Sequence, residues 1–156
     1  MKHPNQRRRA LQALALAPLA AGVPGAFAQA SGVRILTVEE LIRPHVGSDP
    51  VTESGMRLQL PTLADNGHVV PARISVDSPM SDDDHVQQIL LLSTRNPVSR
   101  MAVFTLGPWS GRAEIATRVR LAGTQTVVAL ARLSRGGWRL ATTEVIVTES
   151  ACLDMG

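Results

Sequence analysis

The clearest pattern in the chain is the run Thr126-Val127-Val128-Ala129-Leu130-Ala131-Arg132-Leu133, which precedes Gly136-Gly137 and a second run at residues 138–148. In the first run, successive side chains of an extended strand would place Val128 and Leu130 on one face and Val127 and Ala129 on the other. Glycines tolerate the positive φ angles that a tight hairpin turn requires. The stretch therefore predicts two long antiparallel strands joined by a hairpin turn.

Five further strands are predicted upstream, because short apolar or alternating segments are separated there by Gly, Pro and Asn. Turn residues occur at Asp65-Asn66-Gly67, Asn96-Pro97 and Gly107-Pro108. Short strands at this spacing are typical of an all-β, immunoglobulin-like antiparallel β-sandwich of about seven strands. No disulfide can join its sheets, because Cys152 is the only cysteine. The five upstream segments are residues 56–60, 69–77, 86–92, 101–106 and 112–121.

A short helix is predicted at residues 37–43, before the first strand. Thr37 would cap it, Glu39 and Glu40 would lie in its first turn, and Pro44 would end it. Residues 45–54 have the composition of a loop. The apolar run of residues 89–92 suits the core of the sandwich, and an interface with a second chain is the other interpretation.

The N-terminus has the features of an export signal. Arg7, Arg8 and Arg9 precede an apolar run of about 14 residues, too short to span a bilayer. Ala26-Phe27-Ala28 is an A-x-A cleavage site, so the mature chain is expected to begin at Gln29. Arg8-Arg9 and the low hydrophobicity favour a twin-arginine signal, and an ordinary secretory signal is the alternative. The domain limits are then 1–28 for the signal peptide, 29–55 for the helix and loop, 56–148 for the sandwich and 149–156 for the C-terminal tail.

Removal of this signal changes the charge of the protein. The full chain has 16 Lys and Arg against 13 Asp and Glu, and four of the basic residues, Lys2 and Arg7 to Arg9, lie in the signal. The mature chain therefore has 12 basic and 13 acidic residues, a net charge of −1. Phe104, Trp109 and Trp138 are too few to form a base-stacking surface. Charge and composition thus argue against a nucleic-acid-binding protein.

Familiar catalytic and metal-binding patterns are missing. There is no G-x-S-x-G motif, and Ser110 is interpreted as a turn residue. His45, His68 and His85 lack the spacing of metal ligands. Asp82-Asp83-Asp84 lacks the alternating oxygen ligands of a calcium loop. The sequence predicts neither a metal site nor a cofactor.

Cys152 is the one credible nucleophile, four residues from the end of a chain with an export signal. In an oxidising compartment, an unpaired cysteine implies pairing between chains or a reactive thiol. Glu149 and Asp154 are negative and would raise the pKa of its thiol, because like charge disfavours the thiolate. Such a thiol needs a partner's active site to activate it. This behaviour is expected of a carrier arm rather than an enzyme.

Several blocks of the sequence resemble one known family, and they occur in its order along almost the whole mature chain. The resemblance is to the thiosulfate-oxidation carrier SoxY. It includes Asn96-Pro97 and Val147-Thr148 and continues to the terminal cysteine. The other blocks are Ala64-Asp65-Asn66-Gly67-His68-Val69-Val70-Pro71, Val76-Asp77-Ser78-Pro79-Met80, Ser110-Gly111-Arg112-Ala113-Glu114, Thr117-Arg118-Val119-Arg120-Leu121 and Gln125-Thr126-Val127.

This resemblance implies a periplasmic immunoglobulin-like carrier that forms a heterodimer with SoxZ. It implies that Cys152 holds the sulfur substrate covalently, flanked by Ser150, Ala151 and Leu153. In the family, the cytochrome pair SoxAX conjugates thiosulfate to the cysteine and SoxB releases sulfate. A sulfane dehydrogenase then oxidises the remaining sulfur where that branch exists. The resemblance implies no membrane anchor in the mature form.

The tail departs from the family pattern, which is Gly-Gly-Cys-Gly-Gly or close to it. Leu153 and Met155 are bulkier than glycine, and Asp154 would repel an anionic substrate. This departure from the family pattern is expected to hinder the efficient transfer of sulfur intermediates. The alternative hypothesis is therefore a related binding subunit that does not load sulfur.

Overall fold

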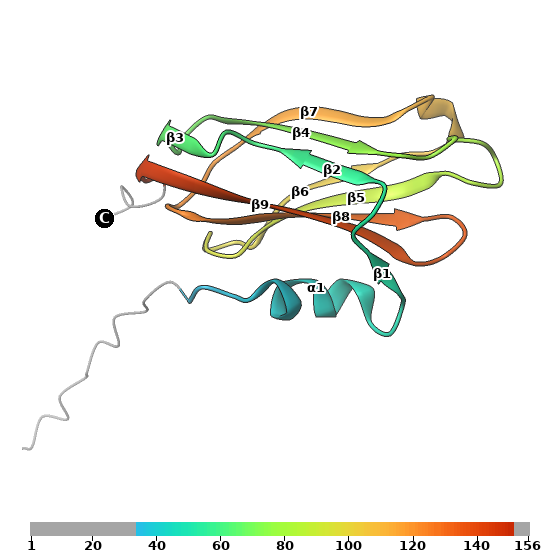
Figure 1. The fold of residues 1–156 in the computed structure, drawn as a ribbon, viewed down its shortest axis with the longest axis horizontal. Helices are drawn as coiled ribbons and strands as arrows, with labels where there is room; N and C mark the ends of the chain where they lie inside the picture. Colours follow the sequence, from blue (N-terminus) through green and yellow to red (C-terminus); the bar gives the residue numbers. More distant parts are fainter. Residues whose placement is uncertain (1–33, 152–156) are drawn as a thin grey trace, which may run out of the picture. The chain divides into compact units, whose positions relative to one another are not determined.

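The computed structural model describes residues 34–151, which form two packed β-sheets and one helix (Figure 1). This confirms the predicted immunoglobulin-like β-sandwich. The signal segment, its cleavage site and Cys152 lie outside the described residues. The elements are α1 (Val38–Val46), β1 (Val51–Thr52), β2 (Met56–Gln59), β3 (Leu63–Asn66), β4 (Val70–Val76), β5 (Val86–Ser93), β6 (Arg100–Thr105), the 3₁₀ turn η1 (Pro108–Ser110), β7 (Ala113–Val119), β8 (Gln125–Leu133) and β9 (Trp138–Glu149).

The predicted hairpin forms the centre of the larger sheet, whose strand order is β1-β9-β8-β5-β6. Strands β8 and β9 pair antiparallel from Gln125 opposite Val145 to Arg132 opposite Trp138. Their turn uses Gly136 and Gly137 at φ angles of 90° and 79°, as predicted. The smaller sheet has the order β2-β4-β7 and is antiparallel throughout.

Two short strands were not predicted, and they make the larger sheet mixed rather than purely antiparallel. Strand β1 lies in the segment expected to be a loop, and β3 immediately precedes the turn at Gly67. Both pair in parallel with β9 (Figure 1). They are two and four residues long, and only Ala64 among their side chains is fully buried, so neither has the alternation that identifies a strand.

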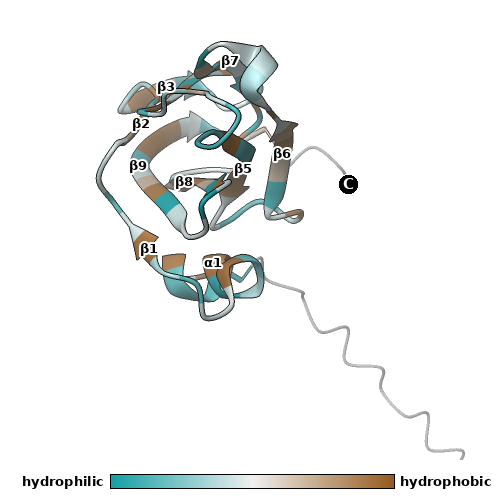
Figure 2. Cartoon of the chain, turned by 90° about the vertical axis from the view of Figure 1, so that its right-hand side faces the viewer, coloured by the Kyte–Doolittle hydropathy of each residue, from teal (hydrophilic) through white to brown (hydrophobic). Residues whose placement is uncertain are grey.

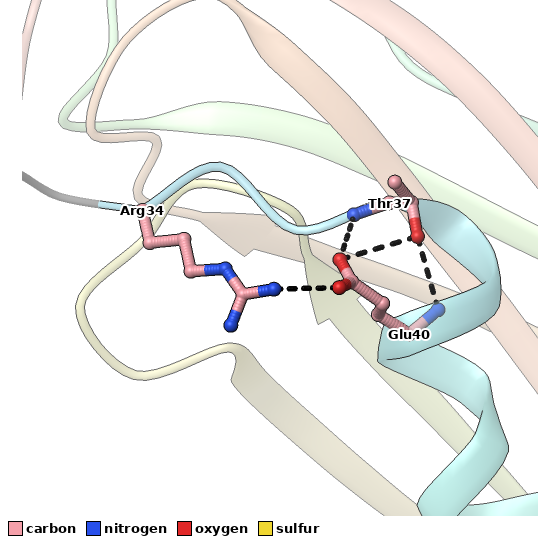
Figure 3. A network of polar contacts seen from close by, with 3 residues as sticks. All are labelled: Arg34, Thr37 and Glu40. Atoms are coloured by element: carbon pink, nitrogen blue, oxygen red, sulfur yellow. Dashed lines mark hydrogen bonds and ion pairs between the residues drawn. The ribbon is translucent and has the colours of Figure 1, made fainter.

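Helix α1 begins as predicted, with a capping box at Thr37. The Glu40 N–H donates to Thr37 Oγ1 at 3.1 Å, and the Thr37 N–H donates to Glu40 Oε2 at 3.0 Å (Figure 3). The Thr37 N–H is the main cause of a lowered pKa at Glu40, and Arg34, 2.6 Å from the carboxylate, lowers it further.

The prediction that Pro44 ends this helix was wrong, because α1 continues to Val46. Pro44 lies in the last turn, where only the bond to the Glu40 carbonyl is lost. The turn is still closed by the Gly47 N–H, which donates to the Arg43 carbonyl at 3.1 Å. Val46 is buried and secures this end of the helix against the sheet.

The larger sheet is apolar on both faces, because one face packs on the smaller sheet and the other packs on α1. The apolar segments of α1 and of the sheet are visible in Figure 2. Ile89 and Leu91 lie in the core between the sheets, whereas Leu90 and Leu92 lie in the core under α1. All four side chains are buried. The interface interpretation of residues 89–92 was therefore wrong.

Truncating Leu41 tests the packing of α1. The side chain is buried against the sheet, and Leu41→Ala is expected to lower the free energy of unfolding by about 2–5 kcal/mol. Glu39→Ala, on the exposed side of the same helix, serves as the control; it removes an exposed ion pair with Arg43 and a first-turn charge, and should change the free energy of unfolding by less than about 1 kcal/mol. Urea denaturation of the mature protein measures both. Equal effects of the two variants would contradict the packing of α1 on the sheet.

Candidate functional site

Cys152, the predicted attachment site, directly follows the last described residue. The structure therefore shows the segment that precedes it. Ser150 and Ala151 directly follow β9. Leu153, Arg8, Arg9, Ala26 and Ala28 lie outside the described residues, as Cys152 does. We call Glu149, Ser150 and Ala151 the tail root.

Hydrogen bonds from two separate loops hold the tail root. The Gly67 N–H donates to the Glu149 carbonyl at 2.8 Å, and the Ala151 N–H donates to the Leu121 carbonyl at 3.1 Å. Ser150 Oγ donates to the Ala122 carbonyl. The two loops are also joined to each other, because the Leu121 N–H donates to the Gly67 carbonyl at 2.8 Å. The chain is therefore fixed up to the residue before Cys152.

Gly67 is required by close packing and not by its φ angle. A turn was predicted at Asp65-Asn66-Gly67, and neither Asn66 nor Gly67 has a positive φ angle there. A Cβ atom on Gly67 would lie 2.4 Å from the Leu121 carbonyl oxygen and 3.0 Å from that of Glu149. Only glycine lets the tail root and the 120–124 loop approach this closely.

Asn96 holds the 120–124 loop from its other side. Its Nδ2 donates to the Arg120 carbonyl at 2.7 Å, and its Oδ1 accepts from the Ala122 N–H at 2.9 Å. Buried Gln125 donates to the same oxygen at 3.0 Å. Asn96 thus bonds both neighbours of Leu121, whose carbonyl holds Ala151. Sequence reasoning found only a turn at Asn96-Pro97 and missed this positioning role.

The tail root is the last described part of the chain, and it directly precedes Cys152 in the sequence. Its hydrogen bonds hold the chain as far as Ala151 against the loops that carry Gly67 and Leu121.

Of the other candidate residues, His68 directly follows Gly67 beside the tail root, where its N–H donates to Asn66 Oδ1 at 2.7 Å, and the rest lie elsewhere in the fold. His45 lies in α1, where burial and then Arg100 lower its pKa, whereas His85 contacts the Ser81 carbonyl at 3.0 Å. Ser110 accepts from the Gly107 N–H within η1, which confirms it as a turn residue. Among residues 34–151, no three His, Cys, Asp or Glu side chains gather as metal ligands would. Within the same range, no helix is long and apolar enough to cross a membrane.

Fold and site together define an immunoglobulin-like domain whose chain is held by hydrogen bonds as far as Ala151, the residue before Cys152. A family model described as sulfur oxidation protein SoxY matches residues 42–152. The chain therefore belongs to the SoxY family. The matched region ends at Cys152 itself.

Solved structures agree with this assignment. The sulfur carrier protein SoxY from Chlorobium limicola f thiosulfatophilum is 27% identical, with a TM-score of 0.57 over 69% of this chain and 92% of that chain. Superoxide reductase (neelaredoxin) from Ignicoccus hospitalis is 15% identical, with a TM-score of 0.53 over 59% of this chain and 79% of that chain. The second likeness shows the fold alone. The search of curated proteins found no match.

Substituting Gly67 tests the packing at the tail root. Gly67→Ala places a Cβ against two carbonyl groups and is expected to lower the free energy of unfolding by about 1–3 kcal/mol. It should also alter the NMR amide signal of Ala151, which is bonded to the displaced loop. Gly136→Ala is the control, because its Cβ meets open space and its cost is only the positive φ, about 1 kcal/mol. An unchanged Ala151 signal in Gly67→Ala would refute this coupling.

Proposed function

We propose that this protein is a periplasmic sulfur carrier that holds intermediates of thiosulfate oxidation covalently on Cys152. One observation carries the proposal: the family match ends at Cys152, and the residue before it is the last one fixed by the tail root. A carrier needs a reactive group at a defined place on its surface. The catalytic groups then belong to the enzymes that it visits, so the protein itself is not an enzyme.

The proposed chemistry uses one thiol and external enzymes. A cytochrome pair of the SoxAX type joins thiosulfate to the thiol, forming an S–S bond and releasing the thiol proton. It accepts the two electrons of this oxidation. A hydrolase of the SoxB type then cleaves the terminal S–sulfonate bond with water, which releases sulfate and leaves a persulfide. Where a sulfane dehydrogenase is present, it oxidises the remaining sulfur.

The proposed partner in the resting complex is a SoxZ-like chain. Residues 89–92 do not supply its interface, because all four side chains are buried within this chain. The heterodimer therefore uses another surface of the domain. Co-expression followed by size-exclusion chromatography tests the pairing, and a monomer that ignores the partner would count against it.

A second candidate function is a SoxY-family subunit that pairs with its partner but does not load sulfur. The observation that favours it is the tail sequence Leu153-Asp154-Met155, which replaces the glycines of the family pattern. Larger side chains hinder entry into a narrow active site. The Asp154 carboxylate repels thiosulfate, which is itself an anion.

Loading is tested directly by intact mass. The carrier pair, incubated with thiosulfate and the cytochrome pair, is expected to gain one thiosulfonate group per chain, and Cys152→Ser should gain none. Tetrathionate provides a chemical control: the thiolate attacks one central sulfur and thiosulfate leaves, which gives the same adduct without an enzyme. A chain that reacts with tetrathionate but is never loaded enzymatically would support the second candidate.

The neighbouring charges predict a pH dependence for the chemical reaction. Glu149 and Asp154 should raise the pKa of the Cys152 thiol, so the thiolate fraction at neutral pH is small and the rate rises with pH. Replacing Leu153 and Asp154 by glycine should lower that pKa and speed both chemical and enzymatic loading. Replacing Leu153 alone by glycine keeps the charge of Asp154, so this variant separates the effect of side-chain size from the effect of charge. Equal loading rates in wild type and both variants would show that the tail sequence does not slow loading.

Export is proposed to follow the twin-arginine route, with cleavage after Ala28. N-terminal sequencing of the exported protein should give Gln29 as the first residue. Changing Arg8 and Arg9 together to Lys should block export and leave the uncleaved chain in the cytoplasm. Unchanged export of this variant would point to the ordinary secretory route instead.

A further inference from the structure

The outer face of the smaller sheet carries a row of arginines. Side-chain alternation turns Arg57 of β2, Arg73 of β4 and Arg118 of β7 to the exposed side, and Arg120 follows β7 on the same side. We call these four residues the arginine face. Arg73 lies opposite Gln59 and Ala116 in the strand register, which makes Arg57 and Arg118 its diagonal neighbours. Such neighbours are about 7–8 Å apart.

None of the four arginines forms a salt bridge within the described residues, and Glu114, the acidic residue on the same side of β7, lies 4.0 Å from Arg112. The salt bridges found among residues 34–151 join Arg34 to Glu40, Arg43 to Glu39 and Arg112 to Glu114, so none of them includes the four arginines. The mature chain has a net charge of −1 by composition. The positive charge is therefore a local property of this face. The protein as a whole has no excess of positive charge that would attract polyanions.

The shape of the face suits a partner's surface. Arg73 and Arg118 line a shallow hollow whose other walls include Pro71 and Ala116. Arg73 and Arg118 are both exposed. A guanidinium binds a carboxylate through two parallel hydrogen bonds, which gives both attraction and orientation.

The arginine face also leads directly to the tail root. Strand β7 ends at Val119, Arg120 follows it, and the next residue, Leu121, accepts the Ala151 N–H. At about 3.3 Å per residue, Leu121 is no more than about 10 Å along the chain from Arg118. A protein docked on this face is therefore close to Ala151, the residue that precedes Cys152 in the sequence.

We propose that the arginine face docks an acidic surface on the enzymes that act on Cys152, and thereby aligns the tail with their active sites. This inference rests on the proposed function, because it concerns the partners of the same site. Docking through charges acts mainly on the association rate and weakens with salt. The carboxylates belong to the partner, and the arginines contribute no chemistry to the sulfur.

The test compares three carrier pairs: wild type, Arg73→Glu/Arg118→Glu, and Arg135→Glu. Arg135 is exposed in the turn between β8 and β9, at the opposite end of β9 from the tail root, and serves as the matched control. Binding to immobilised SoxAX-type and SoxB-type enzymes is measured by interferometry at low and high salt. Tetrathionate loading of each pair checks that the thiol is unaffected.

The double reversal is expected to weaken binding at low salt by about tenfold or more, with a smaller difference at high salt. Arg135→Glu should bind as wild type does, and tetrathionate should load all three equally. Unchanged binding of the double variant, or no binding by wild type, overturns the proposal. Loss of the SoxZ-like chain from the double variant in size-exclusion chromatography also overturns it, because the face would then be the heterodimer interface. Salt-sensitive enzyme binding without enzymatic loading would uphold docking and refute the proposed function.

Discussion

Pairing of β9 along both of its edges is the constraint on which the rest of the structure depends. One edge bonds to β8 over most of its length, and the other bonds to β1 at the beginning and to β3 at the end. The strand thereby connects the segment after α1, the hairpin at the centre of the larger sheet and the turn at Gly67. Because β9 is also the last strand, the pairing that completes the sandwich determines where the tail begins.

The tail root continues the hydrogen-bonded order of β9 for two more residues, Ser150 and Ala151. Backbone bonds from Gly67 and to Leu121 continue the order of β9 through Ala151, and Asn96 fixes the loop that contains Leu121. A carrier benefits from such a base, because a fixed starting point reduces the conformational freedom that must be lost when the tail enters an active site. Two residues of the arginine face, Arg118 and Arg120, lie at the end of β7 and just after it, where the chain enters the same loop, so the proposed docking surface reaches the loop that holds the tail root.

Local sequence patterns were sufficient to predict the long strands. They were insufficient to predict the long-range contacts that hold the tail root. The alternation of β4 and the turn glycines between β8 and β9 come from neighbouring residues, and both were predicted. Strands β1 and β3 were missed because they are short and pair with a strand about 80 residues away. Asn96 was missed for the same reason: its amide bonds residues 24, 26 and 29 positions later. Cys152 was singled out because it is unique in the sequence, which requires no knowledge of contacts, and its role as the attachment site stays a prediction.

Hydrogen bonds hold the chain as far as Ala151, the residue before Cys152. Residue-resolved amide hydrogen exchange of the mature protein under native conditions tests this arrangement most directly. The Ala151 amide is expected to be protected and to exchange together with the amides of Gly67 and Leu121, because the three form one bonded unit. An Ala151 amide that exchanges at the rate of an unstructured peptide, while Gly67 and Leu121 stay protected, would contradict it.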